Sequence, residues 1–141
     1  CMIRNTDDEL YSEIPINGVI NVFSHGIHLC NSGYTTHLSC GYIKGFDGIL
    51  IDKDGILTEK LITINVKTKK PGGGNSGGPL FNYIDLYEVD IAGIYVGYSG
   101  YSKTHGLVGA QRIEHILSTA RIVLVNSNNS NLGEGSGTKG V

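Results

Sequence analysis

The stretch Pro71-Gly72-Gly73-Gly74-Asn75-Ser76-Gly77-Gly78-Pro79-Leu80 decides how this sequence is interpreted. A phosphate-binding loop needs Lys and then Ser or Thr after its last glycine, whereas Gly78 is followed by Pro79. A dinucleotide-binding loop must open a helix, whereas Pro79 leads into a short apolar run typical of a strand. The segment is therefore a candidate for presenting the Ser76 hydroxyl, although a flexible turn with an incidental serine fits the composition equally well.

A serine hydroxyl at this position needs two kinds of help to act as a nucleophile. A base must accept its proton, because the hydroxyl itself is a weak nucleophile. Backbone N–H groups must also face the oxyanion that forms on the substrate. Glycines on both sides of Ser76 allow the tight turn in which successive N–H groups converge.

The composition places this loop in a single globular domain. The chain has 141 residues, of which 40% are hydrophobic and 21 are glycine. The glycines follow no three-residue period, which excludes collagen, and the apolar share is too high for a disordered chain. The net charge is -2, so no basic surface indicates a nucleic-acid partner. Apolar runs are far below the length of about 20 residues that spans a bilayer, so no membrane partner is expected.

The periodicity of the chain predicts about six short strands and one helix. Residues 1–16 are polar and predict an arm without secondary structure, while residues 126–141 predict a flexible tail. The Asp-Gly pairs at 47–48 and 54–55 predict turns, and Asp52 lacks the later oxygen ligands of a calcium loop. The predicted strands are 19–29, 38–43, 61–66, 80–83 and 89–98, with a hairpin over 46–57 and a helix over 110–120.

Three cysteines allow one disulfide and one remaining thiol. Cys30 and Cys40 bracket a short polar loop between apolar flanks, so a hairpin bridge is sterically easy. Two free thiols fit the same spacing. Cys1 would then be a reactive surface thiol or a partner for sequence outside this chain.

Two motifs in this order resemble a known family. Gly74-Asn75-Ser76-Gly77-Gly78-Pro79-Leu80 is similar to the nucleophile motif of chymotrypsin-fold serine proteases, usually Gly-Asp-Ser-Gly-Gly-Pro. Cys30-Asn31-Ser32-Gly33-Tyr34-Thr35-Thr36-His37-Leu38-Ser39-Cys40-Gly41 resembles the Cys-x-Ser-Gly-x-Thr-Thr-x-x-x-Cys-Gly hairpin of the alpha-lytic protease and streptogrisin branch. The resemblance extends from about Val19 to Leu117.

The resemblance implies an all-β fold: a six-stranded antiparallel Greek-key barrel of the trypsin-like serine protease type, spanning 17–125, with a C-terminal helix. It also implies a Cys30–Cys40 disulfide and secretion from the cell. The resemblance implies a protein without a cofactor or a metal. The implied activity is that of a serine endopeptidase acting on polypeptides.

The same resemblance assigns the site residues. Ser76 is the implied nucleophile, and the N–H groups of Gly74 and Ser76 form the oxyanion hole. The segment Tyr95, Val96, Gly97 and Tyr98 lines the substrate cleft as an edge that pairs with the peptide backbone.

Three positions depart from the family pattern. Asn75 replaces an aspartate whose buried charge helps to fix the active loop, so any fixing here depends on neutral contacts. Val96 replaces a common serine, and bulky Tyr98 replaces a cleft glycine. These two changes alter the expected shape of the specificity pocket.

The sequence offers no convincing base or orienting carboxylate. In this family both precede the Cys30 hairpin, on an N-terminal barrel. His25 and His28 lie in the segment leading directly into Cys30, so we expect them to be ordinary strand histidines, one of which faces solvent. Asp7 and Asp8 lie in the polar arm, and we expect both to be solvated. The arm would then link to a missing N-terminal barrel that supplies His and Asp.

Two other classes of function compete with a protease half. The chain could be a non-catalytic, peptide-binding homologue that retains Ser76. It could also be an unrelated carbohydrate-binding module that uses its eight tyrosines as stacking platforms.

Overall fold

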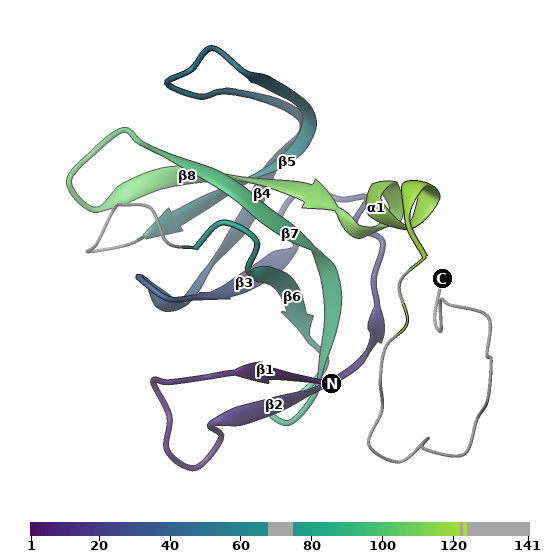
Figure 1. Ribbon diagram of the computed structural model, residues 1–141. Coiled ribbons are helices and arrows are strands. Elements are labelled where there is room, and N and C mark those ends of the chain that lie inside the picture. The colour runs from purple at the N-terminus through teal and green to yellow at the C-terminus, as the bar shows by residue number, and fades with distance from the viewer. Residues whose placement is uncertain (68–74, 122, 124–141) are drawn as a thin grey trace.

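The computed structural model describes residues 1–67, 75–121 and 123 (Figure 1). Within these residues the order is β1 (Met2–Arg4), β2 (Glu13–Val19), β3 (His28–Gly33), β4 (His37–Ile51), β5 (Leu57–Lys67), β6 (Pro79–Tyr83), β7 (Val89–Gly100), β8 (His105–Arg112) and α1 (Ile113–Thr119).

Six of the strands close into an antiparallel barrel. The pairs β3–β4, β4–β5, β5–β8, β8–β7 and β7–β6 follow one another, and β6 pairs with β3 to complete the ring. The predicted six-stranded barrel with a C-terminal helix is confirmed. Strands β5 and β6 are consecutive in sequence but not neighbours in the ring, a strand order typical of a Greek key. Ser76 lies between these two strands in the sequence.

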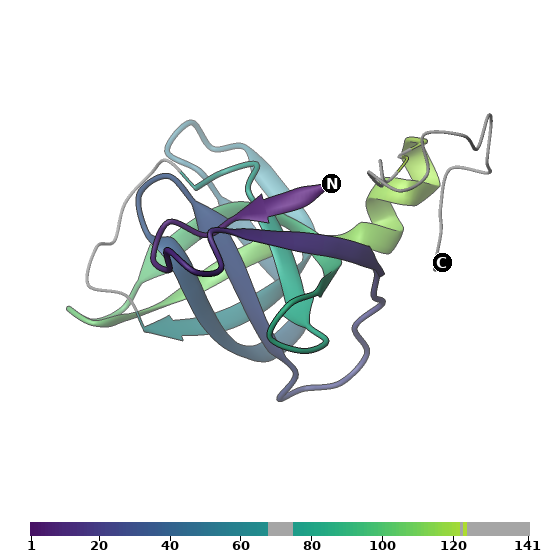
Figure 2. The ribbon, with the colours of Figure 1, turned by 90° about the horizontal axis from the view of Figure 1, so that it is seen from below.

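The prediction that residues 1–16 form an arm without secondary structure is wrong. Strands β1 and β2 form an antiparallel hairpin, and β2 pairs in parallel with the start of β7. Ile3, Ile14 and Ile16 are buried, because both strands alternate apolar and polar residues. Figure 2 shows this hairpin lying across one side of the barrel.

Two groups of buried side chains hold the structure together. The barrel-interior cluster comprises Val22, Leu29, Ile43, Ile62, Ile64, Val66, Leu80, Ala92, Tyr95, Val108 and Ala110. The second cluster joins the hairpin and the helix to the barrel, and comprises Ile3, Ile14, Ile16, Cys30, Phe81, Val89, Ile91 and Ile113. The alternation predicted for 61–66 is confirmed, because Ile62, Ile64 and Val66 are all buried.

Two strand predictions differ from the structure near the first hairpin. Residues 20–27 are irregular and strand β3 begins only at His28. Gly26 adopts a φ of +80°, which a regular strand does not permit, so the predicted strand is interrupted there. Asp47-Gly48 is not a turn but lies within β4, where the pairing with β5 is bulged. The turn at 54–55 is real: Gly55 has a φ of +79°, and its N–H donates to the carbonyl of Asp52.

The C-terminal helix is shorter than predicted. Residues 105–112 form β8, in which Ala110 pairs with Ile62 of β5 and with Tyr95 of β7. Pairing on both sides outweighs the helical preference of Ala110-Gln111-Arg112, so α1 begins at Ile113. No helix of the described residues is long and apolar enough to span a membrane. The predicted tail, 126–141, lies outside the described residues.

Candidate active site

The candidate nucleophile lies next to a buried anchor, Asn75. Asn75 is buried, with 2% of the residue exposed. Its Oδ1 accepts hydrogen bonds from the backbone N–H groups of Thr35 (3.1 Å) and Thr36 (3.3 Å), and its Nδ2 donates to the Thr36 hydroxyl (2.7 Å). These bonds join the Ser76 loop to the turn between β3 and β4. Hydrogen bonds of an uncharged amide therefore hold the loop in place, and both polar atoms of that amide take part.

Gly33 makes this anchor possible. A Cβ atom at position 33 would lie 2.2 Å from Asn75 Oδ1, which is far inside van der Waals contact. The amide can therefore enter the hairpin turn only because residue 33 has no side chain. This accounts for the glycine in the Ser-Gly-x-Thr-Thr part of the hairpin motif.

The loop is also fastened to β7. The Gly77 N–H donates to the Tyr95 carbonyl (2.9 Å), and the Tyr95 N–H donates to the Gly78 carbonyl (2.9 Å). Gly77 has a φ of +84°, which a residue with a side chain rarely adopts. The turn after Ser76 is thus held on one side by the β3–β4 turn and on the other by β7.

Ser76 itself is exposed and accessible. Its hydroxyl donates to the carbonyl of Val96 (3.2 Å). No described residue accepts a hydrogen bond from its backbone N–H, the first of the two predicted oxyanion donors. The second predicted oxyanion donor, Gly74, lies outside the described residues.

Tyr95 lies beneath the loop as part of the barrel-interior cluster. Burial raises the pKa of its hydroxyl, and Tyr98 adds to this effect, while an interaction with the Asn75 side chain works in the opposite direction. The hydroxyl is therefore neutral at physiological pH and acts as a buried neighbour of the anchor. It does not line an open cleft.

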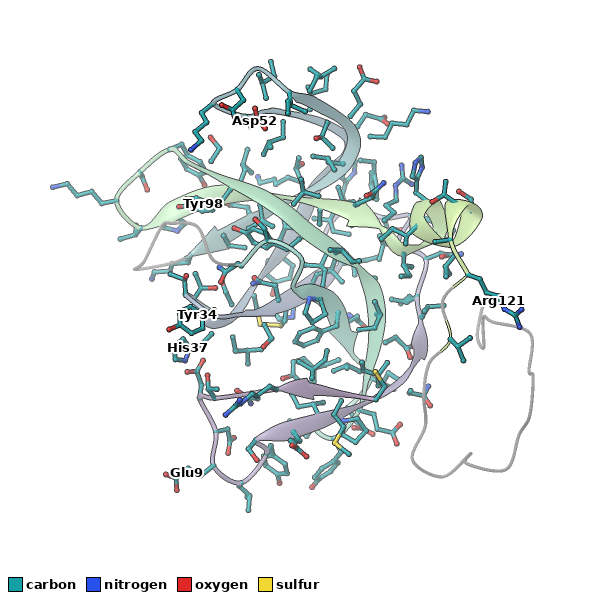
Figure 3. All side chains as sticks on the ribbon, in the orientation of Figure 1. Glu9, Tyr34, His37, Asp52, Tyr98 and Arg121 are labelled. Carbon is teal, nitrogen blue, oxygen red and sulfur yellow. A yellow bond between two sulfur atoms is a disulfide. The ribbon has the colours of Figure 1, made fainter. Side chains whose placement is uncertain are left out.

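The rest of the predicted cleft segment is partly filled by the chain's own side chains. A Cβ atom at Gly106 would lie 2.3 Å from the Tyr98 ring, which therefore covers that glycine. A Cβ atom at Gly97 would lie 2.9 Å from Leu50, which comes from the β4–β5 hairpin. Tyr98 was identified from the sequence as a departure from the family pattern. Leu50 was not identified, because its contact with Gly97 joins positions that are far apart in the sequence. Figure 3 shows Tyr98 where β7 and β8 run together.

None of the five histidines, all of which are described, is hydrogen-bonded to Ser76. His25 and His28 contact the rings of Phe46 and Tyr42, respectively (centroid distances 5.0 and 5.1 Å). Both are exposed and only His28 lies in a strand, whereas two strand histidines with one facing solvent were expected.

His37 has partners that the sequence did not reveal. Its Nδ1 lies 3.2 Å from Asp7 Oδ1 and 2.7 Å from the Thr6 hydroxyl. The second oxygen of Asp7 accepts the backbone N–H of Leu38 (3.0 Å). The β1–β2 hairpin is thereby tied to the same β3–β4 turn that anchors Asn75.

One group of potential metal ligands includes the two cysteines of a disulfide. The ligand atoms of His28, Cys30 and Cys40 lie within 4.8 Å of one another. The two sulfur atoms form the predicted disulfide, with the cysteines directly opposite in the β3–β4 register. They cannot serve as thiolate ligands in this state. Asp52 caps its own turn by accepting the N–H groups of Asp54 and Ile56.

The barrel and the Ser76 loop together define the fold of the bacterial chymotrypsin-like serine proteases, and solved structures of that class match this chain. One is a chymotrypsin of Cellulomonas bogoriensis, with 26% identity and a TM-score of 0.63 over 83% of this chain and 57% of that one. Another is Protease A of Thermobifida fusca, with 22% identity and a TM-score of 0.65 over 83% and 56%. A third is described as a glutamic acid specific serine protease that uses a histidine triad in substrate binding, with 24% identity and a TM-score of 0.62 over 83% and 56%.

The resemblance drawn from the two motifs is confirmed at the level of this fold and class. The chain spans little more than half the length of each of these proteases, which is consistent with a C-terminal half. No protein-family profile matches the sequence, and no curated protein does.

Proposed function

We propose that this chain is the nucleophile-bearing half of a secreted serine endopeptidase, which hydrolyses peptide bonds through an acyl-enzyme on Ser76. The observation that most directly supports this proposal is the position of Ser76. Its hydroxyl is exposed, lies 3.2 Å from the Val96 carbonyl, and belongs to a loop fixed by the buried Asn75. A fixed loop keeps the hydroxyl within reach of a substrate carbonyl, and this preorganisation accounts for much of the catalytic effect of such sites.

The chemistry follows from the groups around that hydroxyl. An extended substrate pairs its backbone with the free edge of β7 at Val96–Tyr98, which brings the scissile carbonyl to Ser76 Oγ. The hydroxyl oxygen attacks the carbonyl carbon while a base takes its proton, and the resulting oxyanion accepts hydrogen bonds from the N–H groups of Ser76 and Gly74. Collapse of this intermediate expels the amine, which takes up the proton from the base, and leaves the acyl group on Ser76. Water then hydrolyses this ester and restores the Ser76 hydroxyl.

Within the described part of the chain, the Ser76 hydroxyl donates to the carbonyl of Val96, which cannot act as a general base at neutral pH. We infer that the acceptor of its proton comes from outside this chain. We therefore propose that an N-terminal barrel, as in the longer proteases of the same fold, supplies a histidine and its orienting aspartate. The disulfide and the similarity to bacterial proteases favour secretion.

A fluorophosphonate probe tests this proposal, because it phosphonylates only an activated serine. We expect no labelling of the isolated 141-residue chain, and stoichiometric labelling at Ser76 when the natural upstream sequence is restored. The Ser76→Ala variant of the extended chain is the matched control. Labelling of the isolated chain would show that the base lies within it, and an unreactive extended chain would contradict the enzyme assignment.

A non-catalytic peptide-binding homologue is the second candidate. It is favoured by the absence of any histidine bonded to Ser76 and by the neutral anchor Asn75. The upstream coding sequence separates the two: a histidine followed by a buried aspartate indicates the protease, whereas neither residue indicates the binding protein. A binding protein would also retain an extended peptide in equilibrium dialysis without cleaving it.

A further inference from the structure

Strand β1 has an edge that no other strand covers. The Ile16 N–H donates to the Cys1 carbonyl, and the Asn5 N–H donates to the Ser12 carbonyl. In an antiparallel pair the hydrogen-bonded positions alternate, so Cys1, Ile3 and Asn5 face β2 while Met2 and Arg4 direct their N–H and C=O groups the other way.

Most of these outward groups are unused. The Arg4 carbonyl accepts the Ser32 hydroxyl. The two groups of Met2 and the N–H of Arg4 have no hydrogen-bond partner within 1–67, 75–121 and 123. An uncovered edge of this kind pairs readily with an extended peptide, because each unpaired group can gain a hydrogen bond.

The same edge borders a cavity of about 540 Å³ between the hairpin and the β3–β4 turn. Met2 and Arg4 line one wall, and Ser32, Tyr34 and His37 line the opposite wall. Tyr34 is 90% exposed and Met2 is 51% exposed, so apolar surface is available beside the free backbone groups. In Figure 3, Tyr34 and His37 lie together at the turn that faces the hairpin.

The charge at this cavity indicates which peptides would bind. Arg4 forms no ion pair with any described residue, even though Glu13 is its partner in the β1–β2 register. Asp7 does not compensate it, because its two oxygens are occupied by His37 and by the Leu38 N–H. A carboxylate placed opposite Arg4 on an added strand would form a cross-strand ion pair.

We propose that the cavity beside β1 binds an extended acidic peptide, which adds as a strand to the free edge at Met2–Arg4 and places a carboxylate on Arg4. The cavity borders the Ser76 loop, because Pro79 and Gly33 also line it, but Ser76 is not among its lining residues. Peptide binding there does not require a competent nucleophile. It would give the chain a second contact with polypeptides.

The test uses a fluorescent eight-residue peptide of alternating valine and glutamate and the 141-residue chain. We expect saturable binding by fluorescence anisotropy, with the largest amide shifts in ¹H–¹⁵N spectra at Met2 and Arg4. Arg4→Gln should weaken binding about tenfold, as expected for a hydrogen-bonded charge. Met2→Pro should weaken it several-fold, because it removes one outward N–H that β2 does not use.

Matched controls separate this site from others. Lys53→Gln removes a cation from the turn that begins at Asp52, at the opposite end of the molecule in Figure 3, and should leave binding unchanged. Ser76→Ala should also leave it unchanged, so failure of the proposed catalysis would not affect this result. The valine–glutamine peptide should bind about tenfold more weakly.

Three results would overturn the proposal. The first is equal binding by the Arg4→Gln and Lys53→Gln variants. The second is a set of amide shifts confined to Val96–Tyr98. The third is a dimer in sedimentation velocity that Met2→Pro converts to monomer while the wild type binds no peptide, since the occupant would then be a second copy of the chain.

Discussion

Replacing Asn75 by alanine should loosen the Ser76 loop and destabilise the whole barrel. The substitution removes three hydrogen bonds: two accepted from the Thr35 and Thr36 N–H groups and one donated to the Thr36 hydroxyl. It also leaves a void where the amide fills the space above Gly33. Both effects act on the folded state, because in the unfolded chain water satisfies the same groups.

The expected magnitude follows from these contacts. Each hydrogen bond contributes about 1 kcal/mol net to stability, so three together contribute about 3 kcal/mol. For a domain of this size, that corresponds to a fall in the melting temperature of roughly 10 °C. Thr36→Ser keeps the hydroxyl and should lower the free energy of unfolding by less than about 1 kcal/mol.

Urea unfolding followed by circular dichroism measures the change in free energy. Asn82→Ala is the matched control, because Asn82 donates one hydrogen bond to the His28 carbonyl (2.9 Å) and should lose about 1 kcal/mol. If Asn75→Ala were no more destabilising than Asn82→Ala, the anchor would not hold the loop and the argument from Asn75 would be wrong.

Three further predictions concern the barrel. Replacing Cys30 and Cys40 by alanine should lower the free energy of unfolding by about 3 kcal/mol in urea, since the bond closes a short loop across 10 positions; an unchanged midpoint would contradict this. Burial raises the pKa of Tyr95, so folding favours its neutral hydroxyl. This contribution to the free energy of unfolding is present below a pH of about 10 and is lost as the pH rises further. Tyr95→Phe should therefore reduce the loss of stability between pH of about 9.5 and 11, and an identical alkaline slope would refute the reasoning. Gly106→Ala should destabilise by about 1–3 kcal/mol because its methyl group meets the Tyr98 ring, and Tyr98→Ala in the same chain should recover most of that loss; a neutral Gly106→Ala would show that the ring moves freely.

The barrel could be predicted because its signals are local or depend on motifs. The alternation over 61–66 and the apolar runs of β6 and β7 required no knowledge of partners. Strand β8 was missed for a physical reason: Gly106, Gly109 and Ala110 give the segment a weak strand preference. It is a strand because β5 and β7 pair with it on both sides, and pairing between distant segments is not visible in a local pattern.

The candidate site was predictable to a similar extent. Ser76 and the neutral anchoring by Asn75 could be inferred from one loop. The partners of Asn75 lie 39 and 40 positions away, and those of His37 lie about 30 positions away, so neither set could be inferred from spacing. The Asp7–His37 contact in particular contradicts the view of Asp7 as a merely solvated carboxylate in a polar arm.

The barrel is closed by a short pairing between β3 and β6, which we call the seam. Among the described residues, strands β3 and β6 pair at two register positions, Cys30 with Phe81 and Asn31 with Leu80, and the disulfide joins β3 to β4 on the other side. Transient opening of the barrel should therefore begin at this seam, with the amides of β6 exchanging with deuterium sooner than those of β5. Gly33 lies at the end of β3, and Ser76 comes shortly before β6. Local opening of the β3–β6 pairing would therefore disorder the nucleophile while most of the sheet stayed intact.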